Sequence, residues 1–410
     1  MNKQTAPEWV NKQLFVGLLE QTHDDFKAIT NFATKAAISE GENYLTIVLR
    51  IQIGMQLKDD SEKEVSYILK IPLVNESGDD HEFHDLFIAE FQMYDRVIPE
   101  LEALYAKNTS IAPSFKPLHL KFPAMTTKCD YILLEDLRTR GYRNAERTVG
   151  LDQLEVEAVL KKLAQWHAAS AKRVTDLGEY EQGLRESYFT PEHLKLIEGF
   201  NMSFTVPFLE CMQKYDLDPG QLLLISDYTS RLTDLYMEFG ANDPQELNVL
   251  NHGDFWCNNF MFKYTDSGQV EDVCFVDFQL PKYGTPAQDL FCLLMTSPKF
   301  DIKLGKFDYF IEYYHRQLVE HLALLKYNQN APTLSQLRAN LRKNSLWAFI
   351  CAQRMLPIVL MPPDEGSNIG NVMGDSEEAS AFKRKMFQSP AYVQQIKTIL
   401  PWLIERSFIR

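Results

Sequence analysis

Hydrophobic residues fall at every second position in a segment near the start of the chain. Between Tyr44 and Ile53 these positions hold leucine or isoleucine, which is the spacing of a β-strand with one buried face. A charged turn separates this segment from a second apolar strand, Val65–Ile71, so the two strands predict a hairpin. The apolar runs Leu118–Phe122 and Tyr131–Leu134 predict two more strands of the same sheet.

The spacing changes to that of helices in the rest of the chain. Apolar residues recur at intervals of three and four over Val156–Ser170 and over Ile225–Phe239, which predicts two amphipathic helices, and Gly240 would end the second one. We therefore predict an α+β, two-lobed fold, with a strand-rich lobe over residues 1–136 and a mostly helical lobe over residues 137–410. The cleft between two such lobes is a usual place for a ligand.

The 410-residue chain has the composition of a globular protein. Hydrophobic residues make up 45% and charged residues 24%, and the length suits two substantial lobes. The formal net charge of −14 repels phosphate backbones and anionic lipids, so neither nucleic acid nor a membrane is expected as a partner. Six cysteines without CxxC spacing and the lack of a signal-peptide stretch or a run of membrane-spanning length favour reduced thiols and a cytoplasmic location.

The densest group of polar residues lies in a loop that precedes an apolar strand. His252, Asp254 and Asn259 have the spacing His-x-Asp-x-x-x-x-Asn, and Asp277 follows after a turn. If the hairpin folds about Gly268, Asn259 and Asp277 are equidistant from the turn and lie side by side at its open end. Two oxygen-bearing side chains are thereby predicted to meet.

These side chains suit magnesium-assisted phosphoryl transfer. Because Mg²⁺ takes one or two hard oxygen ligands from protein, Asn259 and Asp277 are the candidate metal ligands. Asp254 is the candidate base for a substrate hydroxyl, and His252 is interpreted as a residue that orders the loop. A His-x-Asp pair alone is also typical of a hydrogen-bonded turn, but the full motif followed by the hairpin and Asp277 favours the catalytic interpretation.

An acidic protein that binds ATP must bring a cation to the triphosphate, and Lys70 is the candidate. It lies inside an apolar strand, where a charge is costly unless it has a partner. Glu90 falls on the apolar face of a predicted helix over Phe87–Ile98, so it needs a partner too. We predict that the two pair as the phosphate-binding lysine and its orienting glutamate, although each alone could be a snorkelling lysine or a helix-edge glutamate.

Two connecting segments are predicted to border ATP together with Lys70. The turn that precedes the first strand contributes Gly41 and Asn43, although a turn with one glycine is weak evidence for a nucleotide loop. The connection between the two lobes contributes Glu135 and Leu137. These four residues complete the predicted cofactor site.

Two further polar residues are expected to have structural roles. Asp289 stands at the start of an apolar helix, where the helix dipole favours a carboxylate, and in kinase-like folds an aspartate here braces the catalytic loop. His167 lies beside Trp166 on an apolar helix face and is interpreted as a core histidine.

With these residues in place, the chain resembles the ecdysteroid kinase-like family of insects, which is itself similar to choline kinases and aminoglycoside phosphotransferases. The resemblance covers nearly the whole chain. It is carried by the following residues and segments: Gly41–Tyr44, Lys70, Phe87–Tyr94, Leu134–Leu137, Leu163–Ala168, His252–Asn259, Val276–Gln279 and Asp289–Leu290. It implies a protein-kinase-like fold and ATP-dependent transfer of the γ-phosphoryl group to an alcohol, with a steroid hydroxyl as the first candidate.

The chain departs from protein kinases at positions that matter for regulation. Gly253 stands where protein kinases have an arginine that senses activation-loop phosphate, and Gln279 replaces the glycine that follows Asp-Phe. No Ala-Pro-Glu follows Asp277. A phosphorylation-controlled activation loop is therefore not expected.

Several alternatives stay open at this point. The chain could be a non-catalytic ligand-binding pseudokinase, a choline- or aminoglycoside-type kinase, a protein kinase, or a metal-dependent phosphohydrolase that uses His252 and Asp254. An apolar small-molecule alcohol is favoured as the acceptor because the helical lobe is rich in aromatic and methionine side chains that suit bulky ligands. The candidates are Phe200, Met202, Phe204, Phe208, Trp347, Phe349, Met355 and Met361.

Overall fold

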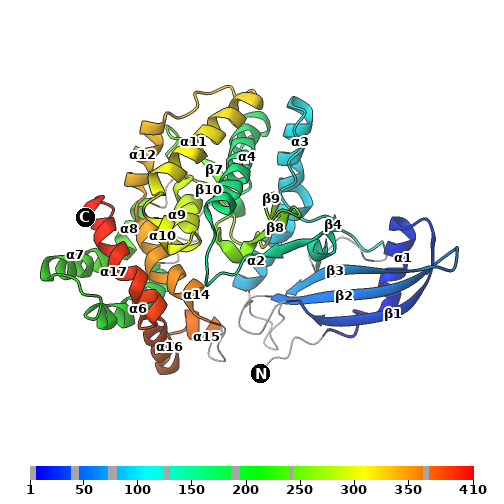
Figure 1. Cartoon of the computed structure of the whole chain (residues 1–410), viewed down its shortest axis with the longest axis horizontal. Helices are drawn as coiled ribbons and strands as arrows, with labels where there is room; N and C mark the ends of the chain where they lie inside the picture. The colour runs from blue at the N-terminus through cyan, green and yellow to red at the C-terminus, as the bar shows by residue number, and fades with distance from the viewer. Residues whose placement is uncertain are drawn as a thin grey trace.

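The structure is a computed structural model that describes residues 6–37, 46–72, 81–123, 125, 130–185, 194–239, 243–362 and 369–410. One end of the molecule is a five-stranded antiparallel sheet in the order β1-β2-β3-β5-β4, with α1 packed against it (Figure 1). The elements of this part are α1 (Lys12–Thr22), β1 (Phe26–Ala36), β2 (Thr46–Leu57), β3 (Glu62–Pro72), α2 (His81–Gln92), a π-helical turn (Met93–Val97), α3 (Ile98–Asn108), β4 (His119–Leu120) and β5 (Ile132–Glu135).

The predicted hairpin is confirmed. Strands β2 and β3 pair in an unbroken antiparallel register that runs from Thr46 opposite Pro72 to Gln56 opposite Glu62. Alternate β2 side chains such as Ile51 and Ile53 enter the core beneath the sheet, which explains the period-two pattern. Strand β1 was not predicted, because most of its side chains are exposed and it carries no apolar alternation.

The predicted helix over Phe87–Ile98 forms part of a longer helical segment. Helix α2 continues through the π-helical turn Met93–Val97 into α3, so the segment runs from residue 81 to residue 108. Phe87, Glu90 and Tyr94 are all buried, as the helical spacing predicted. The segment lies between the sheet and the helical part of the molecule (Figure 1).

Helices make up most of the remaining chain. The elements are a 3-10 turn (Leu137–Arg140), β6 (Tyr142–Asn144), α4 (Gln153–Leu177), α5 (Gln182–Arg185), α6 (Leu194–Met212), α7 (Pro219–Ser230), α8 (Leu232–Phe239), β7 (Val249–Asn251), a 3-10 turn (Cys257–Asn259), β8 (Phe260–Tyr264), β9 (Val270–Phe275), β10 (Lys282–Gly284), α9 (Ala287–Thr296), α10 (Phe300–Lys303), α11 (Phe307–Leu324), α12 (Leu334–Lys343), α13 (Leu346–Ile350), a π-helical turn (Cys351–Met355), α14 (Leu356–Leu360), α15 (Ile369–Met373), α16 (Glu377–Phe387) and α17 (Pro390–Glu405). The predicted α+β, two-lobed fold is confirmed.

The two predicted helices of this lobe have different outcomes. The pattern over Val156–Ser170 lies inside α4, whose start is fixed by a capping box between Asp152 and Glu155. The pattern over Ile225–Phe239 was wrong as a single helix, because the chain breaks at Arg231 into α7 and α8. Gly240, the predicted stop, lies outside the described residues.

The largest hydrophobic core surrounds α4, α9 and α11 and reaches Ile132 and Leu134 of β5. Because this core contains residues from both sides of position 136, it does not mark the predicted domain boundary there, which stays a prediction.

Two candidates for an acceptor pocket belong to this core. Phe208 and Phe349 are fully buried in it, with their ring centroids 6.1 Å apart. Of the helices that the structure describes, none has the length and apolar character needed to cross a bilayer.

Candidate active site

The catalytic-loop candidate runs from the end of β7 to the start of β8, and its backbone is fixed by Asp289. This carboxylate lies fully buried at the start of α9. Its Oδ2 accepts the backbone N–H of His252 at 2.7 Å and its Oδ1 accepts that of Gly253 at 3.0 Å. The expectation that Asp289 braces this loop is confirmed.

Only glycine fits at position 253. Its φ is +85°, a left-handed conformation that disfavours other residues, and a Cβ built there would lie 1.7 Å from the carbonyl oxygen of Leu280. The close approach of residues 253 and 280 therefore excludes an arginine or any other side chain. This gives a steric reason for the departure from the protein-kinase pattern.

Asp254 and Asn259 are joined within the loop. Asn259 Nδ2 donates to Asp254 Oδ2 at 2.9 Å and to the Asp254 carbonyl oxygen at 2.7 Å. Burial and the nearby charge of Asp277 raise the pKa of Asp254 to about 6. Because both donor contacts use Nδ2, the Oδ1 atom of Asn259 is the one left to act as an oxygen ligand.

The hairpin that carries Asn259 and Asp277 has a register one residue away from the prediction. Phe260 lies opposite Phe275, and the N–H of Val276 donates to the carbonyl oxygen of Asn259 at 3.1 Å. Asn259 therefore faces Val276, and Asp277 is the next residue along. The hairpin is centred on Ser267 and not on Gly268, because Tyr264 lies opposite Val270, and a register shift between Lys263 and Tyr264 recovers only part of that difference.

Lys70 connects the sheet with both other parts of the candidate site. Its ammonium lies 2.6 Å from Glu90 Oε1 and 2.6 Å from Asp277 Oδ1. The predicted pairing with Glu90 is thus present, whereas the contact with Asp277 was not predicted. No local pattern could have shown it, because the two residues are 207 positions apart and meet only through the fold.

Lys70, Glu90 and Asp277 lie close enough for their charges to shift one another's pKa values. Burial disfavours the ammonium of Lys70, but Asp277 and Glu90 outweigh it and hold the pKa of Lys70 above its usual value. Burial raises the pKa of Glu90, although Lys70 opposes that shift. Lys70 is therefore a permanent cation held between two carboxyl groups. Asp277 itself has a φ of +67°, an uncommon conformation for an aspartate that places it where a strand ends.

His252 links the loop to the segment that ends in Asp277. Its Nε2 lies 3.0 Å from the carbonyl oxygen of Val276, and since a carbonyl only accepts, Nε2 carries the proton. Burial lowers the pKa of His252, which favours the neutral ring. The contact is consistent with the loop-ordering role that was predicted for it.

A stack of rings supports the same segment and was missed by the sequence analysis. Phe278 packs against His252 with ring centroids 4.9 Å apart, and Trp166 stacks on Phe278 at 5.4 Å. Tyr94 meets Phe278 edge-on at 5.2 Å. His167 hydrogen-bonds Tyr314 and Asp289 inside the core, which confirms its interpretation as a core histidine.

The structure gives little direct support to the residues that were predicted to contact the nucleotide. Glu135 Oε1 accepts hydrogen bonds from the N–H of Leu118 at 2.9 Å and from Arg140 at 3.0 Å, so its side chain is already engaged. Leu137 is buried in a small apolar cluster with Tyr142. Any contact of these two residues with a nucleotide would use the main chain, and their assignment stays a prediction. Gly41 and Asn43 lie outside the described residues.

The oxygen atoms of Asn259 and Asp277 are the candidate ligands for a metal ion. Within the described ranges, no three His, Cys, Asp or Glu side chains gather as a metal-binding cluster. A magnesium site that takes one amide oxygen and one carboxylate from protein needs no such cluster. Asn259 Oδ1 and the Asp277 carboxylate fit that simpler requirement.

A model of the ecdysteroid kinase-like family matches residues 40–327 of the chain. The chain belongs to this family. Every candidate site residue of this ecdysteroid kinase-like chain, from Gly41 to Asp277, falls inside the matched range. Among curated proteins, no sequence matches it.

Solved structures with similar folds are distant from this ecdysteroid kinase-like chain. A putative aminoglycoside phosphotransferase from Ralstonia eutropha is 11% identical with a TM-score of 0.45, covering 95% of this chain and 98% of that chain. An amicoumacin kinase solved with AMP-PNP and Ca²⁺ is 11% identical with a TM-score of 0.44, covering 92% and 93%. An aminoglycoside phosphotransferase solved with ADP and hygromycin B is 13% identical with a TM-score of 0.33, covering 93% and 98%.

Proposed function

We propose that this protein is an ATP- and magnesium-dependent kinase that transfers the γ-phosphoryl group of ATP to a hydroxyl group of a small molecule. The observation that carries the proposal is the junction at Lys70. This lysine of the sheet contacts Glu90 of α2 and Asp277 beside the catalytic loop, both at 2.6 Å. A cation, its orienting carboxylate and an oxygen ligand for a metal thus converge from three distant segments.

Lys70 would supply the fixed positive charge for the triphosphate. Glu90 would hold the lysine in place, since its carboxyl group is fully buried and contacts the ammonium directly. Buried charges of this kind are costly to keep, and a ligand-binding role accounts for them better than stability does.

Magnesium would be held by Asn259 Oδ1 and the Asp277 carboxylate. When bound, it would neutralise charge on the phosphate oxygens. Asn259 is fixed for this role by its two hydrogen bonds to Asp254.

Asp254 would act as the base that accepts the proton of the acceptor hydroxyl. Its carboxylate is oriented by Asn259, and its neighbours on the loop are fixed through Asp289. Burial and the charge of Asp277 raise its pKa to about 6, so it still ionises near neutral pH while being a better proton acceptor than an ordinary aspartate. His252 would keep the loop and the Asp277 segment in register.

For the acceptor we propose a hydroxylated molecule with a large apolar body, such as an ecdysteroid, on the strength of the family. A choline- or aminoglycoside-type acceptor and a non-catalytic, ligand-binding role are the competing possibilities. The structure supports an apolar acceptor less than the composition does, because Phe208 and Phe349, two of the candidate pocket residues, are buried in the core. We place the activity in the cytoplasm as part of the same proposal.

The test is an ATP-consumption screen of the purified protein with magnesium against a polyhydroxylated steroid, choline and a polycationic aminoglycoside at matched concentrations. Products are scored by the mass gain of one phosphate, and an Asp254→Asn variant serves as the control. Turnover of the steroid that is lost in the variant supports the full proposal. Preference for choline or the aminoglycoside would refute the apolar acceptor, and ATP binding without transfer to any acceptor would refute the kinase activity.

A further inference from the structure

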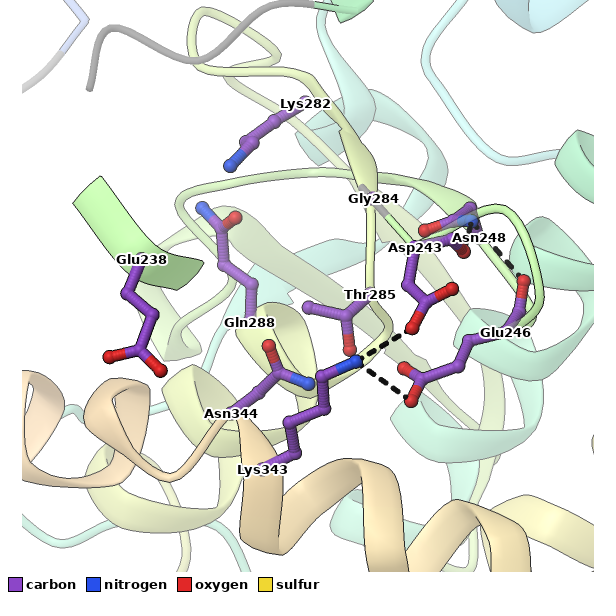
Figure 2. A pocket seen from close by; sticks show the side chains of 10 residues that line it. All are labelled: Glu238, Asp243, Glu246, Asn248, Lys282, Gly284, Thr285, Gln288, Lys343 and Asn344. Carbon is purple, nitrogen blue, oxygen red and sulfur yellow. Dashed lines mark hydrogen bonds and ion pairs between the residues drawn. The ribbon is translucent and has the colours of Figure 1, made fainter. Parts of the chain in front are cut away.

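A polar pocket opens on the helical lobe between α8, β10, the start of α9 and the end of α12 (Figure 2). It is a shallow, partly open depression, and the space of about 430 Å³ over its lining includes open solvent. Among the described residues, none that lines it has an apolar side chain. The lining residues are Glu238, Asp243, Glu246, Asn248, Lys282, Gly284, Thr285, Gln288, Lys343 and Asn344.

One side of the pocket is fully paired within the protein. Lys343 bridges Asp243 at 2.8 Å and Glu246 at 3.2 Å. Glu246 also accepts from Asn340, whose Oδ1 accepts the Thr285 hydroxyl at 2.6 Å. One ammonium faces two carboxylates, so this group is fixed in place and keeps a net negative charge; it is called the acidic wall below (Figure 2).

The other side carries polar groups that have no partner. Across the described part of the chain, no hydrogen bond or ion pair involves the ammonium of Lys282, the side-chain amide of Gln288 or the carboxylate of Glu238. Figure 2 shows the ends of Lys282 and Gln288 pointing to the same side of the pocket, on which Glu238 also lies.

Of these unpaired groups, Lys282 has more need of a ligand than Glu238, because its side chain is half-buried whereas Glu238 is exposed to solvent. Burial lowers the pKa of Lys282 to about 8, and no carboxylate offsets the effect. An ammonium in such a place gains most from an anionic oxygen that enters the pocket.

We propose that this pocket is a second ligand site, which binds a small molecule by one anionic group at Lys282 and Gln288 and by hydroxyl or amine donors at the acidic wall. A carboxylate and a phosphate share the required chemistry at the lysine end. A second anionic group would meet Asp243 and Glu246 at the other end, so polyanions are disfavoured.

The pocket adjoins the backbone that supports the catalytic loop. Asn251 Nδ2 donates to the carbonyl oxygens of Lys282 and Thr285, both at 3.1 Å. Asn251 Oδ1 in turn accepts the N–H of Asp289 at 3.3 Å. A ligand at Lys282 and Gln288 therefore contacts the same segment that holds Asp289 against the loop.

Calorimetric titration tests the site without any phosphoryl transfer. The probes are gluconate and glycerol 3-phosphate, which carry one anionic group and hydroxyls, with glycerol and citrate as the uncharged and polyanionic comparisons. We expect Lys282→Met to weaken binding of the matching probe about tenfold to a hundredfold, as for one hydrogen bond to a charged group, and Gln288→Leu to weaken it less. Lys299→Met is the matched control, since Lys299 is a half-buried lysine outside the pocket lining.

Binding of only one of the two probes would support the site and identify the anionic group as a carboxylate or a phosphate. The titrations are repeated with a non-hydrolysable ATP analogue and magnesium present. Loss of the probe signal under those conditions would place the anion in the nucleotide site and overturn the proposal. So would binding of neither probe, equal binding of citrate, or an unchanged affinity in Lys282→Met. None of these results bears on whether the protein transfers phosphate.

Discussion

Replacing Gly253 by alanine should disable the candidate active site for a reason that is purely steric. The φ of +85° costs an alanine about 1–2 kcal/mol in the left-handed region. In addition, its Cβ would lie 1.7 Å from the Leu280 carbonyl oxygen, where carbon and oxygen normally stay about 3.3 Å apart. The loop or the Leu280 segment must therefore move by roughly 1.5 Å, and overpacking of this kind adds about 1–3 kcal/mol.

Such a displacement reaches the neighbouring Asp254 directly. Because a misplacement of about 1 Å can cost on the order of 10²-fold in rate, we expect Gly253→Ala to lose at least that much phosphoryl transfer. The free energy of unfolding should fall by about 2–5 kcal/mol, measured by urea denaturation.

Gly268→Ala is the matched control for this substitution. Gly268 has nearly the same φ, +81°, but a Cβ there meets nothing within 4 Å. It should lose only the backbone term of about 1–2 kcal/mol and keep its activity. If the two variants are equally stable and equally active, the steric reasoning about residues 253 and 280 is refuted.

Three further predictions address the proposed roles. Asp254→Asn should lower phosphoryl transfer by about 10²-fold or more while the Kd for ATP stays close to normal, because a base acts on the transition state; equal losses of both would contradict the assignment. Lys70→Ala and Glu90→Ala should be non-additive, so that the double variant loses little more activity than the worse single one in a double-mutant cycle; additive losses would show that their contact has no role in activity. Asn259→Ala and Asp277→Ala should each raise the magnesium concentration for half-maximal activity several-fold, and a titration identical to that of the parent would exclude them as ligands.

The sequence predicted those parts of the fold in which one face of an element is buried. Strand β2 shows a period of two because alternate side chains enter the core, and α4 shows helical spacing because one of its faces is buried. Strand β1 is exposed along most of its length, so no pattern of hydrophobic residues predicts it. The sequence pattern does not indicate the break between α7 and α8 at Arg231, because apolar residues continue at helical spacing on both sides of it.

For the candidate site, chemistry within one segment was predictable and contact between segments was only partly so. The need of Lys70 and Glu90 for partners followed from their burial in apolar patterns. That Asp277 also reaches Lys70 depends on how two lobes meet, which no spacing encodes. The one-residue register error at Asn259 arose because the hairpin is centred on Ser267 and not on Gly268, a position that turn-forming residues alone do not reveal.

The anchoring of the catalytic loop divides the molecule into two mechanical parts. Inside the helical lobe, Asn259 hydrogen-bonds Asp254, and Asp289 holds the backbone of the two residues that precede Asp254. Lys70 reaches that lobe through a single side-chain ion pair with Asp277. In the proposed kinase, a hinge motion between the lobes would therefore change the distance between Lys70 and Asp277 while the hydrogen bonds around Asp254 stay intact. Under that proposal, substitutions on opposite sides of the Lys70–Asp277 contact would change nucleotide exchange and proton abstraction independently.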